Sequence, residues 1–361
     1  MWLAVGKTRG VIPLVRQGLL LKDSSGGKRG ATREKVGLCI AGCGDYARVH
    51  ARAAKSNRRL IDLYFASRYY DKAARYSHEY GGVGAFAGYR AAVQDPRVQA
   101  TLFCAPHSLH HENLQLAAAC GKHVLMEKPI ATEVADTQAM KNTADRAGVH
   151  LMVAENFRYM PVVNTCADLL GRGTIGRLQG LRFQATKYQR PTGWRLSRSM
   201  MGGGALIDGG IHKLSVLRML GGEPELVCAA APPKVFPEME GEEAVSLLIG
   251  LRGKAVGTLN YSWAAVGGPG KQSALVIGDK GHITFNFYGK TVKVESLGGA
   301  WTVRVGGDAS GTGAMHKAFL NLITKGHPVL SSPQEASGDL ALAAYRSIES
   351  GGRRIDLASG R

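Results

Sequence analysis

The chain has 361 residues, of which 45% are hydrophobic, and its 46 Lys and Arg against 28 Asp and Glu give a formal net charge of +18. This length accommodates two domains of ordinary size, and no apolar run is long enough to span a membrane. The basic residues are scattered and form no helix-turn-helix, zinc-finger or aromatic-interleaved pattern, which argues against a nucleic-acid-binding protein. We expect a soluble globular protein whose six cysteines, with no C-x-x-C pair, indicate a reducing compartment such as the cytoplasm.

The first 33 residues differ in composition from the remainder. They contain seven basic residues and a single acid, Asp23, and Pro13 and Gly26-Gly27 interrupt any helix. An Arg-rich, acid-poor segment is typical of an organelle transit peptide. A disordered extension or an upstream start codon explains the same composition, so targeting and a plain extension both stay open for residues 1–33.

From residue 36 onward, strand-like and helix-like segments alternate in the order of βαβ units. The pattern predicts strands over residues 36–41, 60–66, 99–105, 123–126 and 151–154, and helices over 47–55, 71–80, 112–120 and 134–147. We therefore expect residues 34–155 to form an α/β domain, a Rossmann doubly wound parallel sheet that binds a dinucleotide.

Beyond residue 155 the chain becomes rich in strands separated by short turns, such as Arg252-Gly253. The expected strands cover residues 178–187, 225–235, 244–251, 254–264, 272–277 and segments near 292 and 303, and the expected helices cover 162–170, 205–220, 315–324 and 332–350. Short turns between strands indicate antiparallel hairpins. Residues 156–361 should form an α+β domain for substrate binding and oligomerisation, built on a large open antiparallel sheet with helices on one face.

A glycine fingerprint follows the first predicted strand and begins a predicted helix, which is the setting of a dinucleotide-binding turn. Gly42 permits the tight turn, Gly44 lets backbone N–H groups approach the pyrophosphate, and Ala47 allows helix and strand to pack closely. Asp45 and Tyr46 lie between them, in the first turn of the helix, whose N-terminus favours negative charge. A glycine-rich turn without a ligand is the alternative, but the βαβ context favours dinucleotide binding.

The end of the second predicted strand indicates which dinucleotide binds. An NAD-specific site usually has an acidic residue there for the ribose 2′-hydroxyl, whereas this chain has Ser67 and Arg68. A hydroxyl and a guanidinium suit a 2′-phosphate. We expect NADP to be preferred over NAD.

Two further motifs contain residues suited to proton transfer. Lys128 lies in Glu127-Lys128-Pro129, directly after a predicted buried strand, and Asp208 and His212 lie four residues apart in a predicted helix that begins with three glycines. Residues four apart project from one helix face. The alternatives are an exposed turn at Lys128 and a surface pair on an amphipathic helix, which contributes only a few tenths of a kcal/mol.

With these motifs, the chain from about Val36 to its end resembles the Gfo/Idh/MocA oxidoreductases, the family of glucose-fructose oxidoreductase and inositol dehydrogenase. The resemblance rests on the fingerprint, on segments 106–110, 121–129 and 202–212, and on the last helix at 344–351. It implies that Lys128, Asp208 and His212 form the catalytic set. It also implies that Pro106 and His107 lie beside the cofactor and that His110 starts the next helix. Glu127 and Lys128 would line the same pocket, often with a cis peptide bond before Pro129.

The chemistry of the three catalytic candidates leaves their roles partly open. Oxidation of an alcohol needs removal of a hydride from carbon and of a proton from oxygen. His212 is our candidate for the general base because its unperturbed pKa is closest to neutrality, and Asp208 would orient the imidazole or bind a neighbouring hydroxyl. Lys128 would stabilise the alkoxide or exchange the proton itself.

We expect substrate contacts from charged and aromatic residues of the second domain and its boundary, which suit a sugar-like ligand: Glu155, Arg158, Tyr159, Lys187, Trp194 and Arg195. Each has an alternative structural role in the core or between domains. We do not expect a metal site at His107, His110 and His111, because no carboxylate or cysteine stands at ligand spacing.

The expected function is NAD(P)-dependent hydride transfer to or from a hydroxyl or carbonyl carbon of a sugar, cyclitol or related polyol. Ser215 stands where inositol-type members commonly have another acid, which argues against inositol. A redox-assisted NAD-dependent glycosidase and a non-catalytic nucleotide-bound sensor or scaffold are the alternatives. The partners expected are a small polyol or sugar and further copies of the chain in a homodimer or homotetramer, with no nucleic acid and no membrane.

Overall fold

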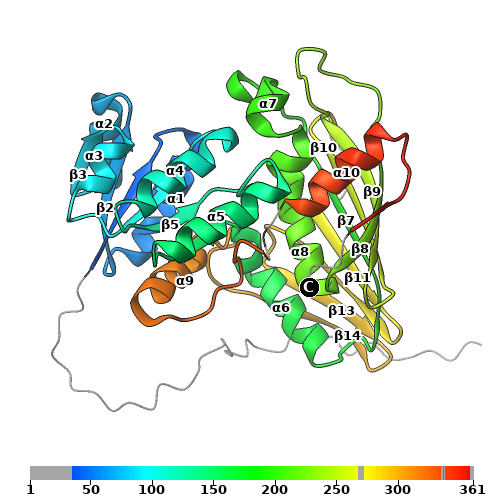
Figure 1. Cartoon of the computed structure of the whole chain (residues 1–361). Coiled ribbons are helices and arrows are strands. Elements are labelled where there is room, and N and C mark those ends of the chain that lie inside the picture. Colours follow the sequence, from blue (N-terminus) through cyan, green and yellow to red (C-terminus); the bar gives the residue numbers. More distant parts are fainter. Residues whose placement is uncertain (1–34, 267–271, 335, 337, 358–361) are drawn as a thin grey trace, which may run out of the picture.

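The computed structural model describes residues 35–266, 272–334, 336 and 338–357; the predicted extension, residues 1–33, lies outside them. Figure 1 shows two domains side by side: a smaller sheet between helices at the left and a large sheet at the right, whose helices face the first domain.

The first domain is built on a six-stranded sheet in the order β3-β2-β1-β4-β5-β6, and every neighbouring pair is parallel. Its strands are β1 (Val36–Ala41), β2 (Ile61–Ser67), β3 (Gly84–Ala87), β4 (Ala100–Phe103), β5 (His123–Met126) and β6 (Leu151–Val153). All six residues of β1 are buried, as expected of a central parallel strand covered on both faces. The predicted Rossmann sheet is confirmed.

Helices cover both faces of this sheet. They are α1 (Asp45–Ala54), α2 (Tyr70–Tyr80), α3 (Tyr89–Gln94), α4 (His110–Ala118) and α5 (Val134–Arg146), with short 3₁₀ turns η1 (Lys55–Asn57) and η2 (His107–Leu109). Side chains of α1 and α2 form one apolar core with the sheet, and those of α3, α4 and α5 form a second on the opposite face. The strand order reverses between β1 and β4, so their carboxyl ends form the edge at which such sheets bind ligands.

The second domain contains a nine-stranded sheet in the order β14-β13-β12-β11-β7-β10-β9-β8-β15. Its strands are β7 (Leu178–Thr186), β8 (Pro224–Ala230), β9 (Ala244–Leu251), β10 (Val256–Ser262), β11 (Gln272–Gly278), β12 (Gly281–Asn286), β13 (Thr291–Ser296), β14 (Gly299–Arg304) and β15 (Ile355–Asp356). Burial alternates along β9, as in a sheet with one covered face. The sheet is antiparallel as predicted, except that β7 and β10 pair in parallel.

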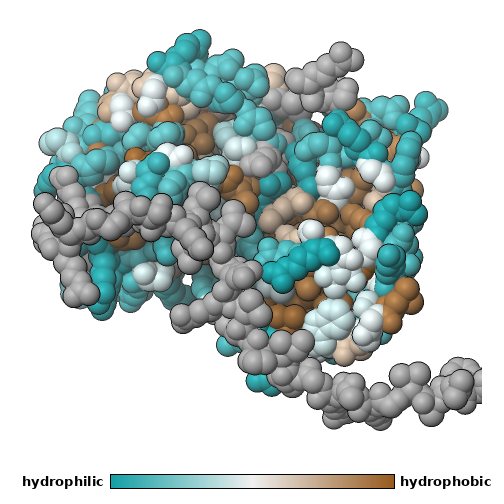
Figure 2. All heavy atoms as spheres, turned by 90° about the horizontal axis from the view of Figure 1, so that it is seen from below, coloured by the Kyte–Doolittle hydropathy of each residue, from teal (hydrophilic) through white to brown (hydrophobic). Residues whose placement is uncertain are grey.

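Helices pack on one face of the large sheet and leave the other face open. The elements on the packed side are η3 (Asn156–Tyr159), α6 (Pro161–Gly171), η4 (Gly193–Leu196), α7 (Arg198–Met201), the π-helical turn η5 (Leu206–Gly210), α8 (Ile211–Gly221) and α10 (Asp339–Glu349). Apolar residues of α6, α8 and α10 share one core with the inner sheet face. Seen from below, hydrophilic side chains cover much of the molecule, and apolar ones gather in several places, including over the second domain at the right (Figure 2).

The chain returns to the first domain near its end. Helix α9 (Thr312–Lys325) packs against α1, and Met315, Phe319 and Leu320 belong to the apolar core beside β1 and β2. The first domain is thus completed by a segment that the sequence pattern assigned to residues 156–361.

Short elements account for most differences from the predicted pattern. Strands β3, β12 and β15 and helix α3 were not predicted, and α10 begins at Asp339 rather than near residue 332. The edge strand β3 has four residues without a buried apolar face, so neither length nor alternation marks it. The helix predicted over residues 205–220 begins with the π-helical turn η5.

Candidate active site

The glycine turn between β1 and α1 has the backbone that its sequence predicts. Gly42 has φ +105°, and a Cβ there would lie 2.3 Å from the carbonyl oxygen of Cys104, so only glycine fits. Gly44 is the N-cap of α1, which receives no side-chain cap, and a Cβ on Gly44 would meet no atom within 4 Å. The helix N-terminus therefore opens onto space beside unpaired N–H groups, which suits an anion.

The end of β2 and the helix α2 that follows it place a hydroxyl and positive side chains near this turn. Ser67 is buried and its Oγ accepts a hydrogen bond from the backbone N–H of Tyr69 at 3.3 Å, whereas Arg68 is exposed. Burial raises the pKa of Cys43 in the glycine turn to about 11, and the charges of Lys72 and Arg75 oppose this rise. Cationic groups of α2 thus act on the glycine turn itself.

Lys128 lies at the carboxyl end of β5, before a cis peptide bond to Pro129. Its side chain is buried, and its Nζ donates hydrogen bonds to the backbone carbonyl of Asp208 and to Asp208 Oδ1, the latter at 3.1 Å. The ammonium also lies 5.6 Å from the centroid of the Tyr46 ring. Lys128 therefore connects the first turn of α1 with the second domain.

Asp208 is the anion around which several predicted residues gather. Its Oδ2 accepts a hydrogen bond from Arg195 Nε at 2.8 Å, and its Oδ1 lies 3.9 Å from His107 Nε2. Burial alone would raise the pKa of Asp208, but Lys128, Arg195 and His107 outweigh it and hold that pKa well below its usual range. Asp208 is thus an ionised carboxylate shared by cations from both domains.

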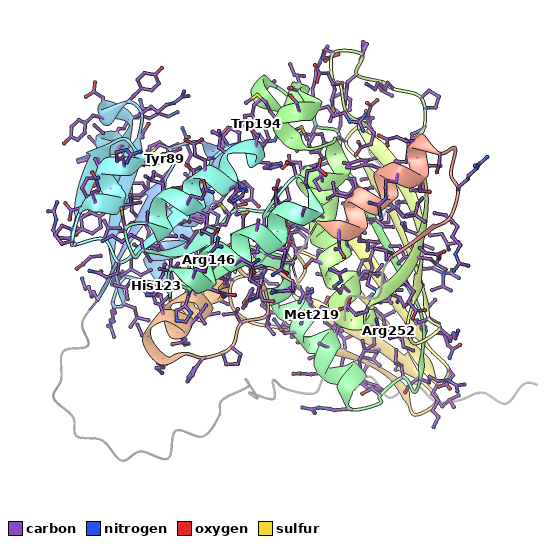
Figure 3. All side chains as sticks on the ribbon, in the orientation of Figure 1. Tyr89, His123, Arg146, Trp194, Met219 and Arg252 are labelled. Atoms are coloured by element: carbon purple, nitrogen blue, oxygen red, sulfur yellow. The ribbon has the colours of Figure 1, made fainter. Side chains whose placement is uncertain are left out.

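Trp194 and His107 close one side of this cluster. Their rings meet edge to face at 4.8 Å, and the Arg195 guanidinium lies 4.7 Å from the centroid of the Trp194 ring. Figure 3 shows Trp194 between α7 and the helices of the first domain. His107 Nδ1 donates to the carbonyl of Met201 at 2.8 Å, and burial lowers the pKa of His107 to about 3, so its ring is neutral.

His212 is paired with Glu155 rather than with Asp208. Its Nδ1 lies 2.7 Å from Glu155 Oε1, and its ring stacks on Phe157 with centroids 4.3 Å apart. Burial lowers the pKa of His212, while Glu155 opposes this effect. A neutral His212 that donates through Nδ1 leaves Nε2 as a base, and no described residue forms a hydrogen bond with Nε2.

This arrangement corrects the expected relation between Asp208 and His212. Asp208 lies in the π-helical turn η5, and His212 lies in the following α-helix, so the two do not share one regular helix face. Asp208 reaches Lys128 and Arg195, and the imidazole is oriented by Glu155. π-Helical turns often occur at functional sites.

A pair of buried histidines, His50 and His316, adjoins the Glu127-Lys128-Pro129 segment. Glu127 Oε1 lies 2.5 Å from His50 Nε2, and His50 Nδ1 lies 2.9 Å from His316 Nε2 in α9. Nothing in the sequence spacing indicates this contact, because residues 50 and 316 are far apart in the chain. His110 Nδ1 donates to the carbonyl of Pro129 at 2.8 Å and so holds the same segment from α4.

Two predicted substrate contacts are engaged elsewhere. Arg158 Nε donates to Ser215 Oγ at 2.8 Å, and Arg158 Nη1 donates to the carbonyl of Leu330 at 2.7 Å. Tyr159 Oη accepts from the backbone N–H of Leu330 at 2.9 Å. Both side chains are buried in contacts that join η3 to the segment after α9.

Two kinds of feature are absent from residues 35–266, 272–334, 336 and 338–357. No set of three or more His, Cys, Asp or Glu there is grouped so that it could hold a metal ion. No helix there is long and apolar enough to cross a membrane.

Two models of one protein family match the two domains separately. Residues 36–155 match the model described as an oxidoreductase family with an NAD-binding Rossmann fold, and residues 163–284 match the GFO/IDH/MocA C-terminal domain. Together they span most of the described chain.

Curated relatives match about half of the chain. The dTDP-3,4-didehydro-2,6-dideoxy-alpha-D-glucose 3-reductase of Actinomadura kijaniata is 32% identical over 55% of this chain and 60% of its own length. The levoglucosan dehydrogenase of Pseudarthrobacter phenanthrenivorans is 32% identical over 42% of this chain and 40% of its own length. The chain therefore spans about half the length of these two relatives.

Solved structures of this type cover nearly the whole described chain. A levoglucosan dehydrogenase in complex with NADH has a TM-score of 0.84 at 22% identity, covering 90% of this chain and 100% of that one. An NAD-binding oxidoreductase from Klebsiella pneumoniae has a TM-score of 0.81 at 24% identity with the same coverage. These likenesses show a shared fold. Since both of its domains match models of one family, the chain belongs to the Gfo/Idh/MocA oxidoreductases.

Proposed function

We propose that the protein is an NADP-preferring oxidoreductase that transfers a hydride between a nicotinamide and a hydroxyl or carbonyl carbon of a sugar, cyclitol or related polyol. The observation that carries this proposal is the neutral His212, paired with Glu155 at 2.7 Å, beside the Lys128–Asp208 ion pair. The family membership and the names of the sugar-acting relatives support it.

The residues of the first domain fit a bound dinucleotide. The uncapped N-terminus of α1 and the open space at Gly44 would accept the pyrophosphate, with Asp45, Tyr46 and Ala47 in that first turn. Pro106, His107 and Glu127 lie at strand ends along the same sheet edge. When bound there, the nicotinamide would supply or accept the hydride.

His212 and Lys128 divide the proton chemistry in this proposal. His212 Nε2 is the free base that takes the hydroxyl proton in oxidation and returns it in reduction. Lys128 uses two of its three N–H donors on Asp208, so the third remains for the substrate oxygen. A fixed ammonium at this position stabilises negative charge that develops on that oxygen. Asp208 and Glu155 act as positioning residues for Lys128 and His212.

The charges near the end of β2 support the proposed preference for NADP. Arg68 is exposed and free to reach a 2′-phosphate, Ser67 supplies a hydroxyl, and Lys72 and Arg75 add positive charge near the glycine turn. A 2′-phosphate pairs well with a guanidinium. β2 ends in Ser67 rather than in the acidic residue that would favour NAD, and its one acid, Asp62, lies near its start.

Trp194, Arg195 and Lys187 are the proposed substrate contacts. Trp194 and Arg195 stack beside Asp208, and the charge of Asp208 acts on Lys187. An aromatic surface with adjacent charged donors suits the ring and hydroxyls of a sugar. Arg158 and Tyr159 would act at a distance, by holding η3 and therefore Glu155.

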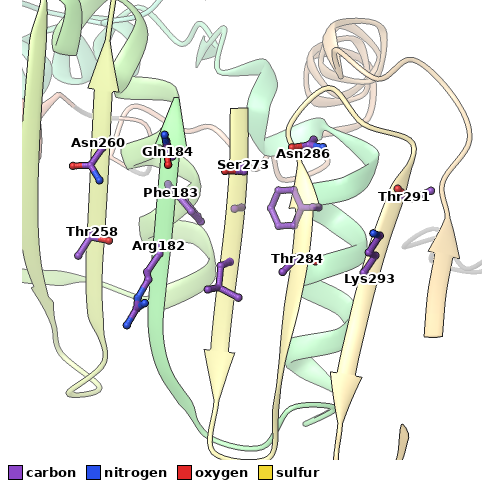
Figure 4. A pocket seen from close by; sticks show the side chains of 13 residues that line it. Arg182, Phe183, Gln184, Thr258, Asn260, Ser273, Thr284, Asn286, Thr291 and Lys293 are labelled. Atoms are coloured by element: carbon purple, nitrogen blue, oxygen red, sulfur yellow. The ribbon is translucent and has the colours of Figure 1, made fainter. Parts of the chain in front are cut away.

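We also propose that the open face of the large sheet joins copies of the chain into a homodimer or homotetramer. Figure 4 shows polar side chains of five neighbouring strands around a hollow on this face, among them Arg182, Gln184, Asn260, Asn286 and Lys293. Such a wide hydrogen-bonding surface suits a self-complementary contact. The free cysteines fit action in a reducing compartment such as the cytoplasm.

The proposal is tested by identifying the nucleotide that the purified protein retains, by mass spectrometry, and then by assaying a panel of polyols and aldoses with NADP and NAD. We expect substrate-dependent formation of reduced nucleotide, faster with NADP. Hydrolysis of a glycoside without net formation of reduced nucleotide would support the glycosidase alternative. No turnover across the panel would favour a nucleotide-bound sensor.

A further inference from the structure

Two lysines beside the proposed site have no anionic partner. Lys213 in α8 is 3% exposed, and Lys187, which directly follows β7, is partly buried. Neither ammonium forms a hydrogen bond or ion pair with any described residue. Lys128, by contrast, is bound to Asp208. Buried ammonium groups without partners are costly, so these two need an explanation.

Lys213 is surrounded by aromatic rings. Its Nζ lies 4.4 Å from the centroid of Phe157, 5.5 Å from that of Tyr261 and 5.6 Å from that of Phe287. These rings attract the ammonium through cation–π contacts but supply no anionic partner.

Lys187 and Lys213 lie along one aromatic wall. Lys187 Nζ is 5.4 Å from the centroid of Trp263, and Trp263 Nε1 donates to Tyr261 Oη at 2.9 Å. Tyr261 in turn faces Lys213. The same Phe157 ring contacts both Lys213 and His212, so the wall continues to the proposed base.

The charges of this region do not balance without a ligand. Lys128, Lys187 and Arg195 supply three cationic side chains, and Lys213 adds a fourth when it is protonated. Asp208 is shared by Lys128 and Arg195, and Glu155 is paired with His212. Burial lowers the pKa of Lys213 to about 7, an effect increased by Lys187 and Lys128 and opposed by Glu155. Burial also lowers the pKa of Lys187.

We propose that the substrate carries an anionic group, a carboxylate or a phosphate, that binds between Lys187 and Lys213 while its reacting carbon faces Lys128 and His212. An anion there would supply the missing partner for both amines and form charge-assisted hydrogen bonds. The substrates would then be sugar acids or sugar phosphates rather than neutral polyols. This inference rests on the proposed function and narrows its substrate class.

Calorimetric titration of the protein saturated with NADPH tests the inference without turnover. The carboxylate arm compares D-glucuronate with D-glucose, and the phosphate arm compares glycerol phosphate with glycerol. We expect one anion to bind roughly 10- to 100-fold more tightly than its neutral counterpart, because hydrogen bonds to charged groups are the strong ones. The arm that shows the preference identifies the anion.

Proton uptake distinguishes an anion that pairs with Lys213 from one that binds elsewhere. Lys213 is largely neutral at about pH 8, and an anion beside it raises its pKa, so binding should take up a proton there. The uptake should vanish well below pH 7, where Lys213 is already charged. Repeating the titration in buffers of different ionisation enthalpy measures it. The other titratable groups around Lys213 include Lys187, Lys128, Glu155, Tyr261 and His212.

Lys213→Met and Lys187→Met remove one charge each and keep an unbranched apolar side chain, and Lys325→Met at the exposed end of α9 is the control. We expect both site variants to lose the preference for the anion, Lys213→Met to lose the proton uptake, and the control to keep both. NADPH binding confirms that each variant is folded. Equal affinity for acid and neutral ligands, or a preference that survives both substitutions, would overturn the inference.

Turnover separates this inference from the proposed function. Hydride transfer to or from neutral sugars with the same efficiency as acids would leave the proposed function standing and contradict the anionic substrate. Absence of hydride transfer with both classes would contradict the proposed function, and the titration would still decide whether Lys187 and Lys213 form an anion site.

Discussion

The Glu155–His212 pair provides a prediction in which charge can be removed with little change of shape. Glu155 is 1% exposed, and its Oε1 accepts hydrogen bonds from His212 Nδ1 at 2.7 Å and from the backbone N–H of Phe157 at 3.1 Å. In Glu155→Gln the amide oxygen can still accept both. The imidazole therefore keeps its Nδ1 proton and its orientation, and only the negative charge is lost.

The expected decrease in kcat follows from the difference between a hydrogen bond to a charged carboxylate and one to a neutral amide. A hydrogen bond to a charged group contributes about 1.5–3 kcal/mol, against about 1 kcal/mol for a neutral one. The imidazolium formed when His212 accepts a proton would lose about 1 kcal/mol of stabilisation, which corresponds to about a fivefold lower kcat. The pKa of His212 should fall further, because Glu155 raises it in the native protein.

The assay is the pH dependence of alcohol oxidation. Only neutral His212 accepts the proton, so activity should decrease as pH falls through the pKa of His212, below its ordinary value of 6.5. In Glu155→Gln the maximal rate should be lower and the acidic limb should move to lower pH. Glu295→Gln is the control, because Glu295 faces His282 at 3.7 Å on the exposed sheet. An unchanged rate and acidic limb in folded Glu155→Gln would refute the proposed role of His212.

Four further substitutions test Lys128, the glycine turn and the nucleotide preference. Lys128→Met should lower kcat by about 10²- to 10³-fold while the affinity for NADP persists, since the ammonium acts on the developing alkoxide; unchanged turnover would remove Lys128 from the mechanism. Gly42→Ala should lower the free energy of unfolding by about 2–3 kcal/mol, because of its positive φ and its contact with Cys104. Gly44→Ala should leave thermal stability unchanged and weaken nucleotide binding about tenfold or more, since a Cβ there occupies the space left for the pyrophosphate; equal effects of both glycine substitutions in thermal melts would contradict this distinction. Arg68→Ala should raise the KM for NADP about tenfold and leave that for NAD unchanged, and parallel changes with both nucleotides in steady-state assays would argue against a 2′-phosphate contact.

Local sequence signals predicted the cofactor domain well, because each depends on a few adjacent residues. The apolar run of β1, the glycines of the turn and the following helix can all be read in order. The position of Lys128 at a strand end has the same origin. The topology rules for βαβ units then place these residues on one edge of the sheet.

Partners that depend on tertiary contact could not be predicted from spacing. The spacing of four residues predicted that Asp208 and His212 project from one helix face. The π-helical turn instead places Asp208 at Lys128, and His212 forms a hydrogen bond with Glu155, 57 residues away. The contact of His50 with His316 spans 266 residues and joins α1 to α9. Glu155 was expected among the substrate contacts because it follows the last strand of the first domain, and nothing in the spacing indicated its pairing with His212.

The burial of Lys213 could not be predicted either, because it also depends on tertiary contacts. A lysine beside a histidine in an amphipathic helix is usually a solvated residue that extends into water. Its burial becomes visible only when Phe157, Tyr261 and Phe287, which come from three separate segments of the chain, are placed around it.

Direct transfer of a labelled hydride tests the central claim most directly. The protein would be incubated with NADPH deuterated at the transferring position of the nicotinamide and with a panel of keto sugars and keto acids, and the products analysed by mass spectrometry. We predict that a reduced product carries the deuterium on its new carbinol carbon, and that Lys128→Met slows this transfer by about 10²- to 10³-fold while still binding NADPH. A product without deuterium, or transfer that continues unchanged in Lys128→Met, would contradict the account.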